Sequence, residues 1–322
     1  MDSKRTEVYR DLWFDDGNLV IQPGLALFRV HKGVLCFHSS LLRDMASFPA
    51  SASFDTYEGA QLAAFPDDAQ DMHHFLRALY VPDYFLPPPE METFEILEGV
   101  LRLAHKYDVP SLRRRALRHM ARACITDLDE LKDEINLNRS HKATFDDLGP
   151  LLEAEIALVR EVQALWVLPI LLLNMGLRDR HELTKTSKYA GKPRALSLED
   201  LLASLSVYEA VMDSDMLEIS YGEPCGSDRC SRREYLIAAV GIATARAKPL
   251  TAFDECQDAP RRRQCDVPRS GARRIIRKKR IWDSLPEFSG LPPWDELSEL
   301  KKQDIEVIPL PYAAQDDAGL RK

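Results

Sequence analysis

The strongest constraint on the fold is a strand–turn–strand pattern near the amino terminus. An apolar run at residues 19–21 is followed, after Pro23-Gly24, by a second apolar run at residues 27–30. Pro fixes φ at the first central position of a type II turn, and Gly supplies the positive φ that the second position requires. We therefore predict a β-hairpin that begins near Trp13 and spans both runs.

Helical periodicity follows the hairpin. Spacings of three and four residues between apolar side chains predict helices over residues 33–45, 66–80, 92–107 and 111–123, with a loop at 47–61 and a short strand at 62–65. In the second half the same criterion predicts a long apolar helix over 151–175 bent near Pro169, a polar loop at 178–194, and helices over 198–212 and 231–246. The fold class is therefore α+β: a small sheet flanked by helices, followed by a mainly helical region.

Composition is that of a folded globular protein, with 45% hydrophobic and 29% charged residues. The first residues are charged and show no secretory signal, and the most apolar stretch, residues 164–173, is too short to span a bilayer. We therefore expect an intracellular protein, in the cytoplasm or the nucleus, that makes no membrane contact and whose six cysteines stay reduced. We divide the chain into residues 1–125, 126–248 and 249–322.

Three ordered blocks, residues 16–45, 62–80 and 100–117, resemble the BTB/POZ domain. The first contains Asp-Gly-Asn-Leu-Val-Ile and Phe-Arg-Val-His-Lys-Gly-Val-Leu, and the last contains Leu-Ala-His-Lys-Tyr-Asp-Val-Pro-Ser-Leu. The chain looks most similar to fungal BTB proteins that begin with Trp-Phe-x-Asp-Gly-Asn. The positions that match the motif are Asp16, Phe28, Val30, His31, Leu35, Ser40, Leu101 and Tyr107.

This resemblance implies a three-stranded sheet flanked by helices, and a role in homo- or hetero-oligomerisation, with a homodimer as one form, and in partner recruitment. In many relatives the partner is a cullin scaffold of a ubiquitin ligase, which recognises an apolar-x-Glu element after the helix that ends here near Met45. This chain offers only Thr56-Tyr57-Glu58, which lies out of position in the predicted loop. Only about ten residues precede Asp11, so we expect the strand exchange used by swapped dimers of the family to be incomplete here.

Histidines and paired acids are the first candidates for chemistry. His31 has no suitably spaced Cys, Ser or carboxylate beside it in the sequence, so we interpret it as a structural link between strand and helix. His73 and His74 point about 100° apart on a helix and cannot form an i, i+4 metal pair, so we expect both at the surface. The pairs at 15–16 and 67–68 lie at a turn and at a helix start, where Asp binds backbone N–H groups.

Late cysteines and a basic segment provide two further candidates. Four thiolates could hold one Zn²⁺, although their spacing also fits free thiols: Cys225, Cys230, Cys256 and Cys265. Residues 261–280 carry ten Lys or Arg and one Asp on a chain of net charge −8. That segment could contact nucleic acid, but its isoleucines favour an amphipathic helix with a solvated basic face. We likewise expect the arginines of residues 111–122 to be solvated, and no cofactor is predicted.

An aromatic and leucine repeat closes the chain. Its members recur every three residues around several prolines: Trp282, Leu285, Phe288, Leu291 and Trp294. Pro292-Pro293 excludes one continuous α-helix. Because such a stretch would be costly to expose, we predict that it docks on an apolar surface, either this chain's own helical half or a partner protein.

The function predicted from these features is that of a protein-interaction adaptor rather than an enzyme. A phosphate-binding glycine loop, a nucleophile elbow and a metalloprotease signature are all missing from the sequence. The alternative function is a nucleic-acid-linked regulator that uses residues 261–280, which we consider unlikely because no aromatic residues interleave the charges.

Overall fold

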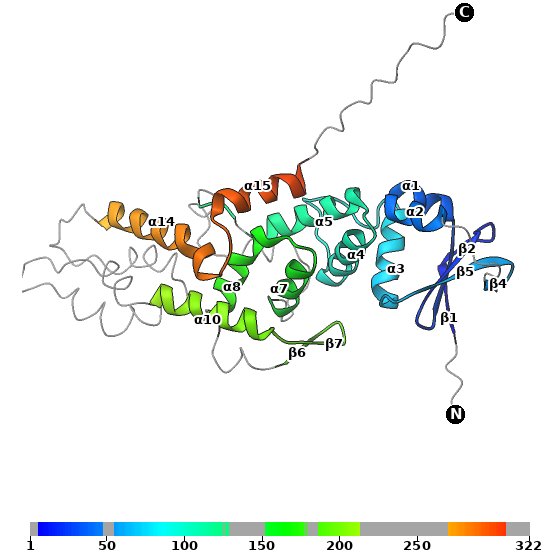
Figure 1. Ribbon diagram of the computed structural model, residues 1–322, viewed down its shortest axis with the longest axis horizontal. Helices are drawn as coiled ribbons and strands as arrows, with labels where there is room; N and C mark the ends of the chain where they lie inside the picture. The colour runs from blue at the N-terminus through cyan, green and yellow to red at the C-terminus, as the bar shows by residue number, and fades with distance from the viewer. Residues whose placement is uncertain are drawn as a thin grey trace, which may run out of the picture.

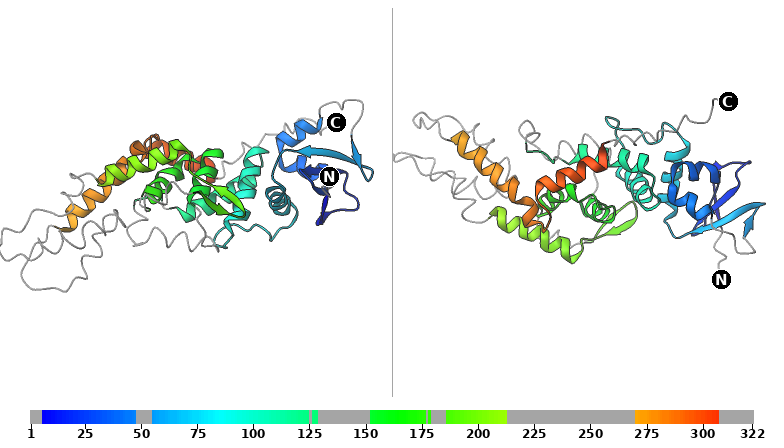
Figure 2. Two further views of the ribbon diagram at one scale, coloured as in Figure 1. Left: turned by 90° about the horizontal axis from the view of Figure 1, so that it is seen from below. Right: turned by 45° about the horizontal axis from the view of Figure 1, so that its top comes forward.

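A computed structural model describes residues 6–47, 55–124, 126–128, 152–176, 178, 186–212 and 270–306, without side-chain detail at 211–212 and 270–278. The described part is elongated, with a β-sheet at one end and helices following one another along the long axis (Figures 1 and 2). This arrangement confirms the α+β fold class with a helical second half. None of the described helices is both long and apolar enough to cross a membrane.

The amino-terminal sheet has five strands in the order β1-β3-β2-β5-β4. Their bounds are β1 Glu7–Trp13, β2 Leu19–Pro23, β3 Ala26–Val30, β4 Thr56–Tyr57 and β5 Ala60–Phe65. The β2–β3 and β4–β5 pairs are antiparallel, whereas β1–β3 and β2–β5 are parallel. The prediction of three strands was therefore wrong. Trp13 ends β1, a strand of its own that pairs with β3 and does not belong to the hairpin.

The predicted hairpin turn is present, with Gly24 at a φ of 61°. Side chains alternate across the sheet, so Phe28 and Val30 face the helices and are fully buried. The opposite face carries a smaller apolar cluster around Val20 and Leu27. Part of the predicted 47–61 loop is β4, which turns back onto β5 through residues 58–59 at positive φ.

The predicted helix over 33–45 is two helices, α1 Lys32–His38 and α2 Ser40–Ser47. The chain is extended at Ser39, whose hydroxyl accepts the Leu42 N–H and donates to the Tyr107 carbonyl. This break changes the direction of the second helix. In α2, Leu42 is buried, whereas Leu41 and Met45 are exposed.

The next three helices confirm the sequence analysis closely: α3 Ala69–Tyr80, α4 Phe94–Lys106 and α5 Pro110–Ala123. Asp68 caps α3 by accepting the N–H groups of Gln70 and Asp71, and Thr93 caps α4. Pro110 begins the first turn of α5, where its missing N–H costs nothing.

The apolar stretch predicted as one bent helix is divided into α7 Leu152–Glu161, the 3₁₀ turn η2 Leu165–Val167 and α8 Leu168–Gly176. The break falls at Gln163, with a φ of 59°, and not at Pro169. Pro169 lies in the first turn of α8, a position that proline tolerates. Gly176 allows close packing, because a Cβ there would lie 2.5 Å from the Ser204 carbonyl oxygen.

The remaining described elements are β6 Ser187–Tyr189, β7 Lys192–Arg194, α10 Leu198–Met212, α14 Ser270–Phe288 and α15 Trp294–Ile305. The prediction of a polar loop over 178–194 was wrong in its second part, where β6 and β7 form a hairpin. Its turn places Ala190 and Gly191 at positive φ, as a two-residue hairpin loop requires.

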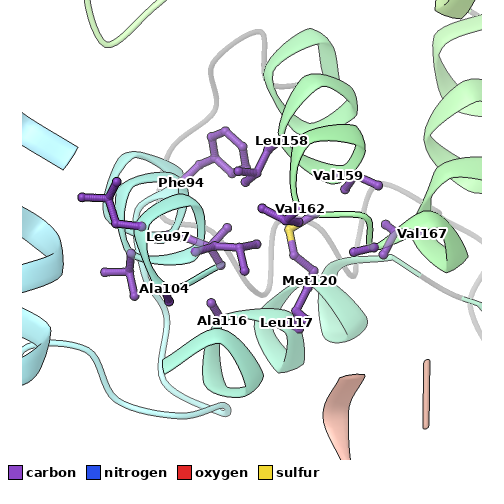
Figure 3. Close-up of a cluster of buried hydrophobic side chains, with 14 of the residues drawn as sticks. Phe94, Leu97, Ala104, Ala116, Leu117, Met120, Leu158, Val159, Val162 and Val167 are labelled. Carbon is purple, nitrogen blue, oxygen red and sulfur yellow. The ribbon is translucent and has the colours of Figure 1, made fainter. Parts of the chain in front are cut away.

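The helices of the first and second halves share one hydrophobic core. Figure 3 shows Phe94 and Leu97 of α4 beside Leu117 and Met120 of α5, with Leu158 of α7 packed against them. All of these side chains are fully buried. Burial of this apolar surface stabilises both halves together. The domain boundary near residue 125 stays a prediction.

The aromatic and leucine repeat packs on the chain's own helical half. Trp282 and Leu285 are buried where α14 meets α8 and α10. The Trp282 and Trp294 rings stack with centroids 4.8 Å apart, and Trp294 Nε1 donates to the Trp282 carbonyl. Phe288 and Leu291 are half-buried against the same core. Residues 289–293 break the helix as Pro292-Pro293 requires, but α14 continues through Pro286.

Replacing Leu101 by Asp should destabilise the protein by about 3–5 kcal/mol, because the carboxylate would be buried without a partner. Leu101 is fully buried in α4. Urea unfolding followed by circular dichroism measures the change. Met91→Asp, at an exposed methionine, is the matched control and should change stability little. Equal unfolding midpoints for the two variants would contradict the placement of α4.

Candidate interaction surfaces

The predicted motif residues His31 and Asp16 connect the hairpin to α3. The His31 N–H donates to the Tyr80 hydroxyl at 2.9 Å, and His31 Nε2 lies 3.1 Å from Asp16 Oδ1. The Phe14 ring packs against both the His31 and Tyr80 rings. The hydrogen bond with His31 lowers the pKa of the Asp16 carboxyl. These contacts give His31 the geometry of a structural residue.

The motif residues Ser40 and Tyr107 lie where α2 meets the end of α4. Ser40 Oγ donates to Asp108 Oδ2 at 2.6 Å, and the Tyr107 hydroxyl donates to Asp67. Burial, together with that carboxylate, raises the pKa of Tyr107. Sequence reasoning missed Ser39, whose buried hydroxyl joins α2 to the Tyr107 carbonyl. The remaining motif positions, Phe28, Val30, Leu35 and Leu101, are buried core residues.

The prediction that His73 and His74 lie at the surface was wrong for His74. Its side chain is buried, with Nδ1 2.5 Å from the Tyr84 hydroxyl and Nε2 3.1 Å from the Gln70 amide. Burial and the neighbouring His73 lower the pKa of His74 to about 4. His73 is mostly buried and contacts Asp11 Oδ2 at 2.8 Å. Helical periodicity could have indicated that His74 is buried, because its position lies on the buried face of α3.

The most distinctive surface of the first domain lies on α1 and α2. Phe37 is 79% exposed, Met45 is 52% exposed, and Leu41, between them in the sequence, is 40% exposed. We call these three residues the α1–α2 surface. Sequence reasoning missed it because a single continuous helix over residues 33–45 was predicted, without the break at Ser39. An exposed phenylalanine with apolar neighbours is typical of a surface that another molecule covers.

A charged network joins the first domain to the second half of the chain. Arg102 of α4 binds Asp71 of α3 at 2.6 Å, Glu98 at 2.7 Å and Glu161 of α7 at 2.8 Å. From the β6–β7 hairpin, Lys192 binds Asp71 at 3.0 Å and Arg194 binds Glu98 at 2.6 Å. We call these six residues the junction network. Because it pairs Asp71 and Glu98 twice each, both carboxylates can be buried as ions.

Three arginines of α5 bind the carboxyl end of α15: Arg113, Arg114 and Arg118. The prediction of a solvated face was therefore wrong for the partly buried Arg113, although Arg118 and Arg122 are exposed. Arg113 donates to Asp304 at 2.6 Å, and Arg118 donates to the Ile305 carbonyl at 3.0 Å. Asp304 also accepts the Trp166 indole N–H at 2.8 Å. Cations at this end of a helix also stabilise its dipole. One carboxylate thus connects α5, η2 and α15.

The predicted zinc ligands Cys225, Cys230, Cys256 and Cys265 lie outside the described residues, as does the helix predicted over 231–246. Of the basic segment 261–280, residues 270–280 belong to α14, and its described side chains, Lys279 and Arg280, are exposed. The nucleic-acid alternative therefore stays a prediction. Across the described residues, no three His, Cys, Asp or Glu side chains gather as a metal would require.

The mixed sheet covered by helices, with an apolar helix pair exposed beside it, defines an α+β interaction module. Residues 16–123 match the family model of the BTB/POZ domain. This part of the chain is therefore a BTB/POZ domain, a general protein–protein interaction module. No curated protein and no solved structure matches the chain.

Replacing Arg102 by Met should lower the free energy of unfolding by about 3 kcal/mol, because three carboxylates each lose a partner. Arg102→Lys should recover only part of this loss, since one ammonium cannot bind three carboxylates in the geometry of a guanidinium. Denaturant unfolding measures both variants. Arg114→Met is the control, because Arg114 makes a single long bond of 3.3 Å to the Glu306 carbonyl. An Arg102→Met variant with the same free energy of unfolding as the parent would contradict the stabilising role of the junction network.

Stability should fall as the pH drops from about 6.5 to 4 through the titration of His74. Its folded pKa of about 4 lies below the ordinary value of 6.5, so the unfolded chain binds the proton more readily. The stability that depends on His74 staying neutral is present in full above pH 6.5 and is lost as the pH falls to 4. It amounts to about 3 kcal/mol.

His74→Gln should show a smaller fall than the parent protein in unfolding experiments across this pH range. A ring resonance of His74 that titrates near pH 6.5 in NMR spectra would contradict the prediction.

Proposed function

We propose that this chain is a protein-interaction adaptor whose BTB/POZ domain binds another protein through the α1–α2 surface. The observation that carries this proposal is the exposure of Phe37, Leu41 and Met45 on one helix pair of a folded domain. Covering such side chains releases about 25 cal/mol for each Å² removed from water. The family match supports the same role, since BTB/POZ domains are interaction modules.

The partner that we propose for this surface is a second copy of the chain. Arg43 and Asp44 lie within the same helix as Leu41 and Met45, so the surface carries both charge signs beside its apolar centre. A two-fold dimer requires such a self-complementary surface, because the same residues meet from both sides. The amino-terminal strand β1 pairs with β3 of its own chain, so the proposed dimer does not depend on strand exchange.

A cullin scaffold is the other partner that the family resemblance implies. Thr56 and Tyr57 form β4, and Glu58 occupies the turn that follows. These residues pair with β5 and do not extend α2. We therefore rank the cullin below the second copy, and binding of a cullin without self-association would favour it instead.

The proposal also includes the broader expectations from the sequence. The chain acts inside the cell, is not an enzyme, and comes from the fungal group of BTB proteins. The helical regions 126–248 and 249–322 support the BTB/POZ domain and provide a further surface for binding. The packing of α14 and α15 on α8, α10 and α5 supports treating these helices as one supporting body.

Phe37→Glu combined with Met45→Glu should convert a dimer to a monomer, because four carboxylates would meet in the two-fold interface. Size-exclusion chromatography with light scattering on the full chain measures the molar mass. Leu25→Glu, at an exposed leucine in the β2–β3 turn, is the matched control and should leave the dimer intact. A parent protein that remains monomeric at high concentration would contradict self-association through this surface.

A further inference from the structure

The outer face of α10 is a second exposed apolar surface, far from the BTB sheet (Figures 1 and 2). Leu198 is 71% exposed and Leu202 is 55% exposed, more than any other leucine among the described residues. The two lie four residues apart and so share one face of the helix. The exposed Glu209 falls on the same side and the exposed Glu199 lies at its edge, about 100° from Leu198, so leucines and carboxylates adjoin here.

A hollow of about 430 Å³ adjoins this face, between α7 and the start of α10. Its apolar wall contains Ile156, Ala157 and Leu196, and its polar wall contains Glu153 and Glu199. Glu199 therefore belongs both to the hollow and to the outer face of α10. The two features form one continuous surface, which we call the α10 surface.

The charges of the hollow favour a cationic group. Its one basic lining residue, Arg160, already binds Asp200 at 2.8 Å and lies 3.4 Å from Glu199. Glu153 is 7% exposed; its Oε1 lies 3.6 Å from Arg178, and its Oε2 is buried with no hydrogen-bond partner. A buried carboxylate oxygen without a donor is costly, so a turn of the Glu153 side chain toward a donor in the hollow would be stabilised by the bond that forms.

We propose that the α10 surface binds a basic amphipathic segment of a partner protein. An apolar side chain of that segment packs on Leu198 and Leu202. A Lys or Arg side chain enters the hollow, with its methylene stem along Ile156 and Leu196 and its charged end at Glu153. The carboxylates at the surface repel an acidic segment and attract a basic one before contact.

This proposal gives the adaptor a second binding surface. It rests on the proposed function in one respect: an adaptor binds two partners. The first partner binds at α1–α2 beside the BTB sheet, whereas α10 lies in the helical half, on the other side of α4 and α5 (Figure 1). Loss of binding at the α10 surface should leave self-association unchanged. The two proposals can therefore fail independently.

Fluorescence anisotropy of a labelled helical peptide on the full chain tests the proposal. The probe carries Leu and Lys at i, i+4 spacing, and the comparison peptides replace each Lys by Glu or scramble the order. We expect the Leu/Lys peptide to bind at least about tenfold more tightly than either comparison peptide. Equal affinity for the Leu/Lys and Leu/Glu peptides would overturn the proposal.

Three variants locate the binding. Leu198→Ser with Leu202→Ser should weaken the Leu/Lys peptide about tenfold, and Glu153→Gln should weaken it several-fold while keeping the side-chain shape. Leu300→Ser, at a 36% exposed leucine on α15, is the matched control and should bind as the parent does. Circular dichroism confirms folding, and light scattering should give the parent molar mass for each variant. Parent-like affinity in the Leu198/Leu202 variant or in Glu153→Gln would overturn the proposal.

Discussion

The shared hydrophobic core of α4, α5 and α7 is the interaction on which the rest of the structure depends. BTB helices α4 and α5 would expose Phe94, Leu117 and Met120 if the second half of the chain did not cover them. The helices that cover them, α7 and η2, have fully buried faces of their own. Each half therefore completes the other, and the orientation of the BTB sheet relative to the helical body follows from this packing.

Charged contacts surround that core and make it specific. The junction network requires Arg102, Lys192 and Arg194 to meet particular carboxylates, which favours the same alignment of the two halves as the apolar packing does. The contact between Arg113 and Asp304 fixes the carboxyl-terminal helix in the same way. Together these pairs hold the α1–α2 surface and the α10 surface at fixed positions, which an adaptor with two partners requires.

Sequence periodicity predicted α3, α4 and α5, because each has a clear apolar stripe of its own, and it also predicted α10. It could not predict the break at Ser39, which is formed by a hydroxyl bonded to a residue 68 positions away. The β6–β7 hairpin was not predicted for a related reason. Its charged side chains indicate a solvent-exposed loop, and their pairing with Asp71 and Glu98 is known only from the fold. Both candidate surfaces depend on which apolar side chains stay exposed after folding, and tertiary packing decides that.

The bond between Arg113 and Asp304 joins residues 191 positions apart. During synthesis the BTB/POZ domain leaves the ribosome long before its α5 arginines can meet α15. At typical elongation rates the interval is on the order of ten to forty seconds. Throughout that time the nascent domain presents a cationic helix and an incompletely covered core to its surroundings. Chaperones that recognise basic and apolar segments therefore have a defined window in which to act on this chain.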